Sequence, residues 1–310
     1  MKKGIPINFL WREFTRVTGE FLYTRYTRTF INGFLVASLL YFHAEDSYEK
    51  KIFETLSLYV KDKTSDTSNR EETLLLNCLH LINTLGQNRA NIFSKEVKSF
   101  KSFVIHPVTY DLITANGACG SHAYILSRLL NELKITNRIA QMKVGERYSG
   151  HVLVEAKTAK GWVVLDGLYG LCFKKADGQL ASFKDVQHNW SYYCTQVPSN
   201  YNHKYKYEGV RYTNWNKIPL VMPAIKGILM LAIGKEAVNE LSLRTALLRK
   251  FHLLFNMTVF ICLTIFAGVI FNYTRRNTII VKKRFPFLYL DKKSLLAKAN
   301  ELDRKRAYYL

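Results

Sequence analysis

Apolar residues in the middle of the chain recur with two different periods, and each period predicts a different element. After Cys119 they recur at spacings of three and four, at Ala123, Leu126, Leu129, Leu130 and Leu133. Such spacing places side chains on one face of a helix. We therefore expect a helix that begins at residue 120 or 121 and ends at about residues 131–133, with Cys119 at its N-terminus.

Between Gly150 and Gly167 the period shortens to two, which is typical of half-buried strands. On the first strand, Val152, Val154 and Ala156 alternate with His151, Leu153 and Glu155. A second strand is expected at Trp162 to Asp166. A helix followed by an antiparallel hairpin predicts an α+β fold.

The hairpin is expected to bring His151 next to Asp166. If its strands close symmetrically about Thr158 and Ala159, Ala156 pairs with Gly161, and His151 faces Asp166 directly on one side of the sheet. Directly opposed Cβ atoms lie ~4.5–5.5 Å apart, so Nδ1 of His151 can hydrogen-bond the carboxylate and leave Nε2 for a thiol. A slip of one residue would send the two side chains to opposite faces.

Cys119, His151 and Asp166 follow one another in an order that suits cysteine chemistry. The unpaired amides and positive dipole at a helix N-terminus favour a thiolate over a thiol, whose free pKa is ~8.5. A nucleophile, a base and a group that orients the base are what covalent acyl transfer requires. Each residue also has a structural explanation: a buried cysteine, a strand-edge histidine and a turn-forming aspartate. Their combination predicts cysteine-based acyl transfer.

The stretch from Ala115 to Phe173 resembles the transglutaminase-like superfamily. The matching elements are Gly117-Ala-Cys119, the helix to Leu133, the segment from Leu133 to Ala140 that leads into the next strand, Gly150-His151, and Trp162 before Asp166. The resemblance implies a papain-like core in which the cysteine-bearing helix packs on an antiparallel sheet. It also implies that Cys119 is the nucleophile, His151 the general base and acid, and Asp166 the orienting carboxylate.

Two positions depart from the pattern of this superfamily. His151 is followed by Val152-Leu153 where the superfamily often has Ala-Trp, and Asp166 is followed by Gly167 where it often has Pro. Neither change removes a catalytic atom. No side chain upstream of Cys119 identifies itself as the oxyanion donor, although Asn116 is near; the backbone amide of Cys119 is a generic substitute.

An uncharged apolar stretch from Phe251 to Phe271 predicts a transmembrane helix, because ~20 apolar residues match a bilayer core. The chain of 310 residues has a net charge of +21, concentrated at its two ends. Since Lys and Arg favour cytoplasmic flanks, both termini are expected inside and the Cys-His-Asp domain on the non-cytoplasmic face. Five scattered cysteines predict neither a disulfide framework nor a zinc site.

Four further segments stand out, and three of them leave alternatives open. Phe30 to Phe42 is a signal anchor, a membrane-lying amphipathic helix, or a helix packed on the domain. Ile218 to Gly234 is a lipid-contacting or re-entrant segment, or a docked helix.

Thr73 to Leu85 is expected to be a core helix, with Cys78 and His80 in structural roles. Between Asn189 and Trp215, tyrosines alternate with basic residues, as in a surface that stacks bases or sugars or meets a membrane, or in an ordinary half-exposed strand or loop.

We therefore divide the chain into a basic N-terminus with a short apolar anchor or amphipathic helix (1–43), a transglutaminase-like domain (44–216), an apolar linker that can associate with a membrane (217–250), a transmembrane helix (251–271) and a basic tail (272–310). The predicted function is a membrane-anchored cysteine enzyme that acts on peptide or carboxamide bonds through a thioester. Hydrolysis, as in a protease or amidase, is favoured over crosslinking because water is the default acceptor. Expected partners are a protein or peptide substrate and membrane lipid, without nucleic acid, metal or cofactor.

Three alternatives to this function stay open at the level of the sequence. One is a catalytically silent module that binds or assembles at the membrane. Another is a metal site formed by Cys119, His122, His151 and Asp166, since His122 lies one helical turn after the cysteine. The last is nucleic-acid binding by the basic tail, although basic residues beside a transmembrane helix more often contact anionic lipid.

Overall fold

The computed structural model describes residues 25–64, 70–92, 101–114 and 118–284, together with residues 300 and 304. Its contacts divide the chain into two units, one of residues Ala37–Asn256 and the other of Met1–Val36 with Met257–Leu310. We call the first unit the body. Three sets of residues named above lie outside the described ranges: the basic N-terminal residues, Asn116 with Gly117, and most of the tail beyond Arg284.

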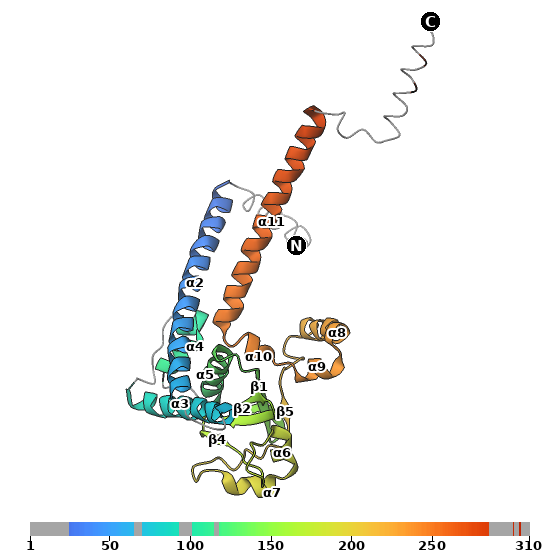
Figure 1. Cartoon of the computed structure of the whole chain (residues 1–310). Coiled ribbons are helices and arrows are strands. Elements are labelled where there is room, and N and C mark those ends of the chain that lie inside the picture. Colours follow the sequence, from blue (N-terminus) through green and yellow to red (C-terminus); the bar gives the residue numbers. More distant parts are fainter. Residues whose placement is uncertain are drawn as a thin grey trace, which may run out of the picture. The chain divides into compact units, whose positions relative to one another are not determined.

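A five-stranded antiparallel sheet lies at the centre of the body, with strand order β4-β3-β2-β1-β5. The strands are β1 (Asn137–Val144), β2 (Arg147–Thr158), β3 (Gly161–Asp166), β4 (Leu171–Cys172) and β5 (Val210–Arg211). Helices make up most of the remaining regular structure (Figure 1). The predicted α+β class is confirmed.

The helices of the described residues are α2 (Arg25–Asp62), α3 (Arg70–Ile92), α4 (Val108–Ile113), α5 (Cys119–Glu132), α6 (Phe183–His188), α7 (Trp190–Tyr193), α8 (Val221–Ile233), α9 (Lys235–Glu240), α10 (Leu243–Ala246) and α11 (Lys250–Arg284). A π-helical turn at Lys101–Ile105 and a 3-10 turn at Cys194–Gln196 complete the set. The predicted helix after Cys119 is confirmed as α5, and the predicted core helix forms part of α3.

Separate apolar clusters cover the two faces of the sheet. On one face, Val152 and Val154 of β2 pack with α3 and α5, where Leu126 and Leu129 are fully buried. Burial of a leucine side chain stabilises a fold by about 1.5–3 kcal/mol. On the other face, Leu153 packs with aromatic residues of the segment between β4 and β5. The predicted alternation of the two faces of β2 is therefore confirmed.

The hairpin between β2 and β3 corrects the predicted register. The predicted closure about Thr158 and Ala159 placed Ala156 opposite Gly161. In the structure Thr158 pairs with Gly161, so the turn residues are Ala159 and Lys160. The Thr158 hydroxyl accepts from the Lys160 amide at 3.2 Å and donates to the Gly161 carbonyl at 2.9 Å, which fixes this turn. The displacement is two residues. Because strand side chains alternate with a period of two, an even displacement keeps each of them on its predicted face.

One helix among the described residues is long and apolar enough to cross a bilayer, namely residues Lys250–Arg275 within α11. At 1.5 Å per residue its 26 residues extend roughly 39 Å, more than a hydrocarbon core of about 30 Å. The predicted span of residues 251–271 lies inside it. The apolar segment Phe30 to Phe42 forms the early part of α2 and does not meet the same criterion.

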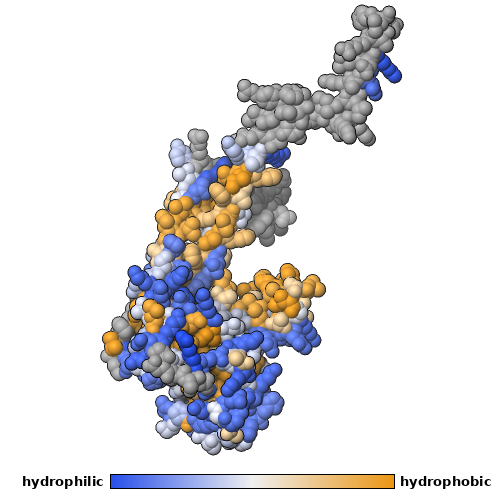
Figure 2. All heavy atoms as spheres, in the orientation of Figure 1, coloured by the Kyte–Doolittle hydropathy of each residue, from blue (hydrophilic) through white to orange (hydrophobic). Residues whose placement is uncertain are grey.

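Most of the segment from Ile218 to Gly234 forms α8, and none of the residues in this helix is buried. In Figure 1, α8 and α9 project from the side of the body. In the space-filling view the α8 part of this projection is strongly hydrophobic, whereas the part beneath it is hydrophilic (Figure 2). The linker predicted at residues 217–250 thus contains three short helices, α8, α9 and α10.

Candidate active site

His151 and Asp166 form a hydrogen-bonded ion pair inside the body. Nε2 of the imidazole lies 2.7 Å from Oδ2 of the carboxylate, and the two residues are 0% and 1% exposed. The predicted partner atom was Nδ1, so this detail was wrong. In the corrected register Asp166 follows Leu165, which pairs with Val154, and so it lies diagonally from His151 rather than opposite it. Diagonal neighbours are farther apart, and the outer ring nitrogen, Nε2, bridges that longer distance.

The second oxygen of the Asp166 carboxylate is held by the turn that follows β3. Oδ1 accepts from the backbone amides of Leu168 at 3.1 Å and Tyr169 at 3.4 Å. An aspartate that binds amides two and three residues ahead stabilises its own turn. Both carboxylate oxygens are therefore engaged, and Oδ2 is fixed in the direction of the imidazole.

Cys119 is the first residue of α5, and its partly buried thiol lies near His151. Burial alone would raise the pKa of this thiol, but polar contact with His151, the charge of that residue and the Val152 backbone amide together lower it below its usual value. Nδ1 of His151 has no hydrogen bond of regular geometry among the described residues. Contacts of this kind are often long or poorly aligned in a substrate-free site.

The pKa of His151 moves in the opposite direction. Burial alone would lower it, but the charge of Asp166, the hydrogen bond to that carboxylate and the contact with Cys119 raise it to about 9. These two directions favour a protonated imidazole beside a thiol that ionises more readily than a free cysteine. Such a pair is the activated form of a cysteine nucleophile.

A wall of tyrosines covers the imidazole. The Tyr205 ring stacks on the His151 ring with centroids 4.2 Å apart and planes inclined by 11°. The hydroxyl of Tyr201 donates to the Tyr205 carbonyl at 3.1 Å, and the Tyr169 ring lies 4.7 Å from that of Tyr201. The sequence showed the density of tyrosines in this region but did not indicate contact with His151, because the contact is long-range and follows no period.

The first turn of α5 is fixed by a buried carboxylate, Asp111. The Ser121 hydroxyl donates to Asp111 at 2.8 Å, and the Arg249 guanidinium donates to its two oxygens at 2.7 and 2.8 Å. Burial would raise the pKa of Asp111, but hydrogen bonds from His106 and Arg249 hold it below its usual value. Asp111 therefore ties the start of the thiol helix to the residue that precedes α11.

His122 does not join the site in spite of its position one turn after Cys119. Its Nδ1 lies 3.3 Å from the Ala118 carbonyl oxygen, and its ring packs so closely on Gly86 that a Cβ there would lie 1.9 Å from Nε2. Across the described part of the chain, no three His, Cys, Asp or Glu side chains are grouped as ligands of a metal would be. The structure thus gives no support to the metal alternative.

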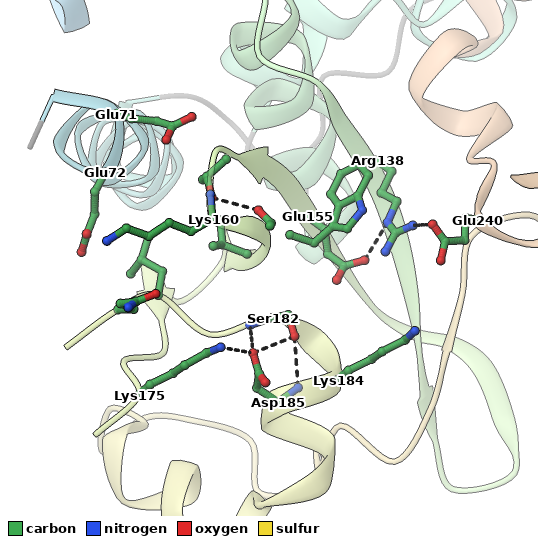
Figure 3. A pocket seen from close by; sticks show the side chains of 16 residues that line it. Glu71, Glu72, Arg138, Glu155, Lys160, Lys175, Ser182, Lys184, Asp185 and Glu240 are labelled. Atoms are coloured by element: carbon green, nitrogen blue, oxygen red, sulfur yellow. Dashed lines mark hydrogen bonds and ion pairs between the residues drawn. The ribbon is translucent and has the colours of Figure 1, made fainter. Parts of the chain in front are cut away.

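A cavity of about 290 Å³ (Figure 3) has a lining that contains none of Cys119, His151 and Asp166. Arg138 lies at its margin, between the rings of Trp162 and Tyr212 and within 3.0 Å of Glu155 and Glu240. Arg138 is thus paired with two carboxylates. The cavity therefore adds nothing to the chemistry of Cys119.

Comparison with protein-family models, curated proteins and solved structures finds no match to this chain. The interpretation of its site accordingly rests on the residues and their geometry. The arrangement comprises a thiol at a helix start, an imidazole held by a carboxylate, and an aromatic cover.

Proposed function

We propose that the protein is a membrane-anchored thiol enzyme with a transglutaminase-like core that transfers acyl groups from peptide or carboxamide bonds. The observation that carries the proposal is the 2.7 Å contact of His151 with Asp166 beside Cys119 at the start of α5. A base that is oriented by a carboxylate and lies next to a thiol is the usual requirement for cysteine acyl transfer.

In the first half-reaction the Cys119 thiolate attacks the carbonyl carbon, and a carbon–sulfur bond forms. The carbonyl electron pair moves to oxygen, where the backbone amide at the helix start is our candidate donor. The intermediate then collapses, the carbon–nitrogen bond breaks, and Nδ1–H of His151 protonates the departing amine. A thioester on Cys119 and a neutral imidazole are left.

In the second half-reaction the neutral His151 removes a proton from water as the water oxygen attacks the thioester carbon. The carbon–sulfur bond breaks, which releases a carboxylic acid and restores the thiolate and the imidazolium. Asp166 stabilises the cation in both resting and final states through its hydrogen bond to Nε2. An amine in place of water would give a crosslink, but water is the default acceptor, so we favour hydrolysis of a protein or peptide substrate.

Anchoring to a membrane is the second part of the proposal and rests on the apolar span within α11. The basic residues after this span favour a cytoplasmic C-terminus. We therefore place the body on the non-cytoplasmic face.

A silent binding or assembly module is the alternative, and one observation favours it. His151 is 0% exposed, and the ring of Tyr205 covers it. An imidazole that stays covered when substrate is present would not transfer protons to it.

Alkylation of Cys119 by iodoacetamide across a range of pH tests the enzyme proposal. In the full chain we expect Cys119 to react with an apparent pKa below ~8.5. In His151→Ala the apparent pKa rises, because the contact and charge of His151 are lost while burial and the charge of Asp166 still raise it. His80→Ala, which removes an exposed histidine of α3, is the matched control and leaves the profile unchanged. Cys78, whose pKa is raised to about 12, is an internal standard for an inert thiol.

If Cys119 is unreactive, or if its apparent pKa is the same in His151→Ala as in the full chain, only the silent alternative is left. If the thiol is reactive, the next experiment offers glutamine-containing peptides as substrates. It measures the release of ammonia and the incorporation of a labelled amine side by side. Ammonia release alone indicates hydrolysis, whereas amine incorporation indicates crosslinking.

A further inference from the structure

Helix α8 presents apolar side chains to its surroundings on the surface of the body. Ile228 is 67% exposed and Leu231 is 91% exposed, and Lys226 is the only charged residue of the helix. Its 13 residues extend roughly 20 Å, too short for a bilayer core of about 30 Å. An exposed apolar helix of this length suits the interfacial layer of a membrane rather than a span across it.

A groove of about 470 Å³ joins the start of α8 to the start of α11. Met222 of α8 and Leu253 of α11 both line it, so its apolar side is continuous with the two membrane-compatible helices. We call this feature the basic groove, because its charged lining is Arg211, Lys217, Arg244, Arg249 and Lys250, with no Asp or Glu among the lining residues.

Among the described residues, the positive charge of the basic groove is largely uncompensated by carboxylates. Arg249 is neutralised by Asp111 behind the groove, whereas Arg244 donates to the neutral Tyr124 hydroxyl at 3.2 Å. Burial, followed by the charge of Arg244, lowers the pKa of Arg211. The Nε of Arg211 is also buried without a hydrogen-bond partner within the described residues. Two like charges held together with a donor unused favour a bound anion.

We propose that the basic groove binds the phosphate of an anionic phospholipid whose acyl chains lie against α8 and the first turns of α11. Arginine suits a phosphate oxygen pair geometrically, and the apolar residues at the groove margin suit the chains that follow the headgroup. An anionic lipid is favoured over a zwitterionic one because the described lining of the groove holds no carboxylate for a headgroup amine. This inference uses the membrane anchoring proposed above and is independent of the chemistry of Cys119.

The test uses the full chain in nanodiscs of mixed phosphatidylcholine and phosphatidylglycerol, with retained lipid identified by native mass spectrometry. We expect phosphatidylglycerol to be retained selectively, and its affinity to fall at least ~10-fold in the double variant Arg211→Gln/Arg244→Gln, as expected from the loss of charge-assisted hydrogen bonds. Lys217→Gln, at an exposed position that leaves the fold intact, gives a smaller loss in the same direction. The matched control, Lys160→Gln/Lys184→Gln, removes two exposed charges from the other cavity (Figure 3) and has no effect.

Two further arms identify the source of the phosphate. Excess inorganic phosphate should neither bind in place of the lipid nor displace it, and Ile228→Asp/Leu231→Asp should weaken retention by removing the apolar contact of the chains. Three results would overturn the proposal. They are equal retention of both lipids, unchanged retention in the arginine double variant, and binding of inorganic phosphate that is the same with and without Ile228→Asp/Leu231→Asp.

The outcomes also separate this proposal from the proposed enzyme. A chain that fails to enter the nanodiscs overturns the anchoring itself, whereas a chain that enters without lipid preference overturns only the basic groove. Cys119 alkylation on the same samples reports on the enzyme independently, since none of the altered residues belongs to its site.

Discussion

Cys78 on α3 and Cys119 on α5 pack against the same apolar cluster, yet their thiols differ in chemistry. Cys78 is 0% exposed, and burial raises its pKa to about 12. Burial acts in the same direction at Cys119, but the contact and charge of His151 and the Val152 amide outweigh it. The placement of polar partners, rather than depth in the core, therefore decides which of these two thiols has the lower pKa.

Replacing Asp166 by Asn should have the largest effect on this contrast. Without the carboxylate charge, burial lowers the pKa of His151, and Cys119 loses its neighbouring cation. We expect alkylation of Cys119 near neutral pH to slow by ~100-fold, the usual scale for loss of a positioned proton-transfer group. Asp177→Asn, in a loop away from the site, serves as control. An unchanged rate in Asp166→Asn would show that the pair does not activate the thiol.

Alkaline pH should weaken the same pair without mutation. The pKa of His151 is raised from 6.5 to about 9, so its stabilising effect is complete below pH 6.5 and is lost as pH rises through about 9. At 1.36 kcal/mol per pKa unit, the loss amounts to about 3 kcal/mol. Thermal unfolding in detergent across this interval measures it. The Asp166→Asn variant should lack this decline, and a decline of equal size in that variant would assign it to other groups.

Cys78→Ser tests the inert member of the comparison. A serine hydroxyl at this position would be buried among apolar side chains, which costs about 1–3 kcal/mol without a partner. We expect a lower melting temperature and unchanged labelling of Cys119. Cys194→Ser is the matched control, because its sulfur already donates to the Ser191 carbonyl at 3.2 Å and a hydroxyl can keep that bond. A loss of Cys119 reactivity in Cys78→Ser would mean that the two thiols are coupled.

Tyr205→Leu should give the smallest change. A protonated imidazole stacked on a tyrosine gains about 0.5–1 kcal/mol from the ring, so its loss lowers the pKa of His151 by less than one unit. Titration of the His151 ring protons by NMR measures the shift. Tyr192→Leu, which removes a half-exposed ring outside the stack, is the control. A rise in the pKa would contradict a stabilising role for the stack.

The sequence predicted the elements of the site well because each has a local signal. The periods of three to four and of two identified α5, β2 and β3. The acyl-transfer chemistry inferred from the order of Cys119, His151 and Asp166 stays a prediction. The register was displaced by two residues because the hydroxyl of Thr158 fixes a turn that alternation alone does not specify. The faces were still correct, because face depends only on parity.

The parts that escaped prediction depend on contacts distant in sequence. Which nitrogen of His151 meets the carboxylate follows from the register, and the cover by Tyr205 follows from the path of a loop 54 positions away. Asp111 gave no sequence signal either, because its partner Arg249 lies 138 positions later. Periodicity reports local geometry and carries no information about such pairs.

The link between Asp111 and Arg249 has a consequence for the order in which the protein matures. Asp111 is 2% exposed, and a buried carboxylate that loses its cation destabilises a fold by about 3–5 kcal/mol. During synthesis the Asp111 carboxylate has no ion pair with Arg249 until that residue, 138 positions later, has been made. Ser121, at the start of α5, donates to this same carboxylate. A nascent or shortened chain that ends before Arg249 would therefore lack the ion pair behind the first turn of α5.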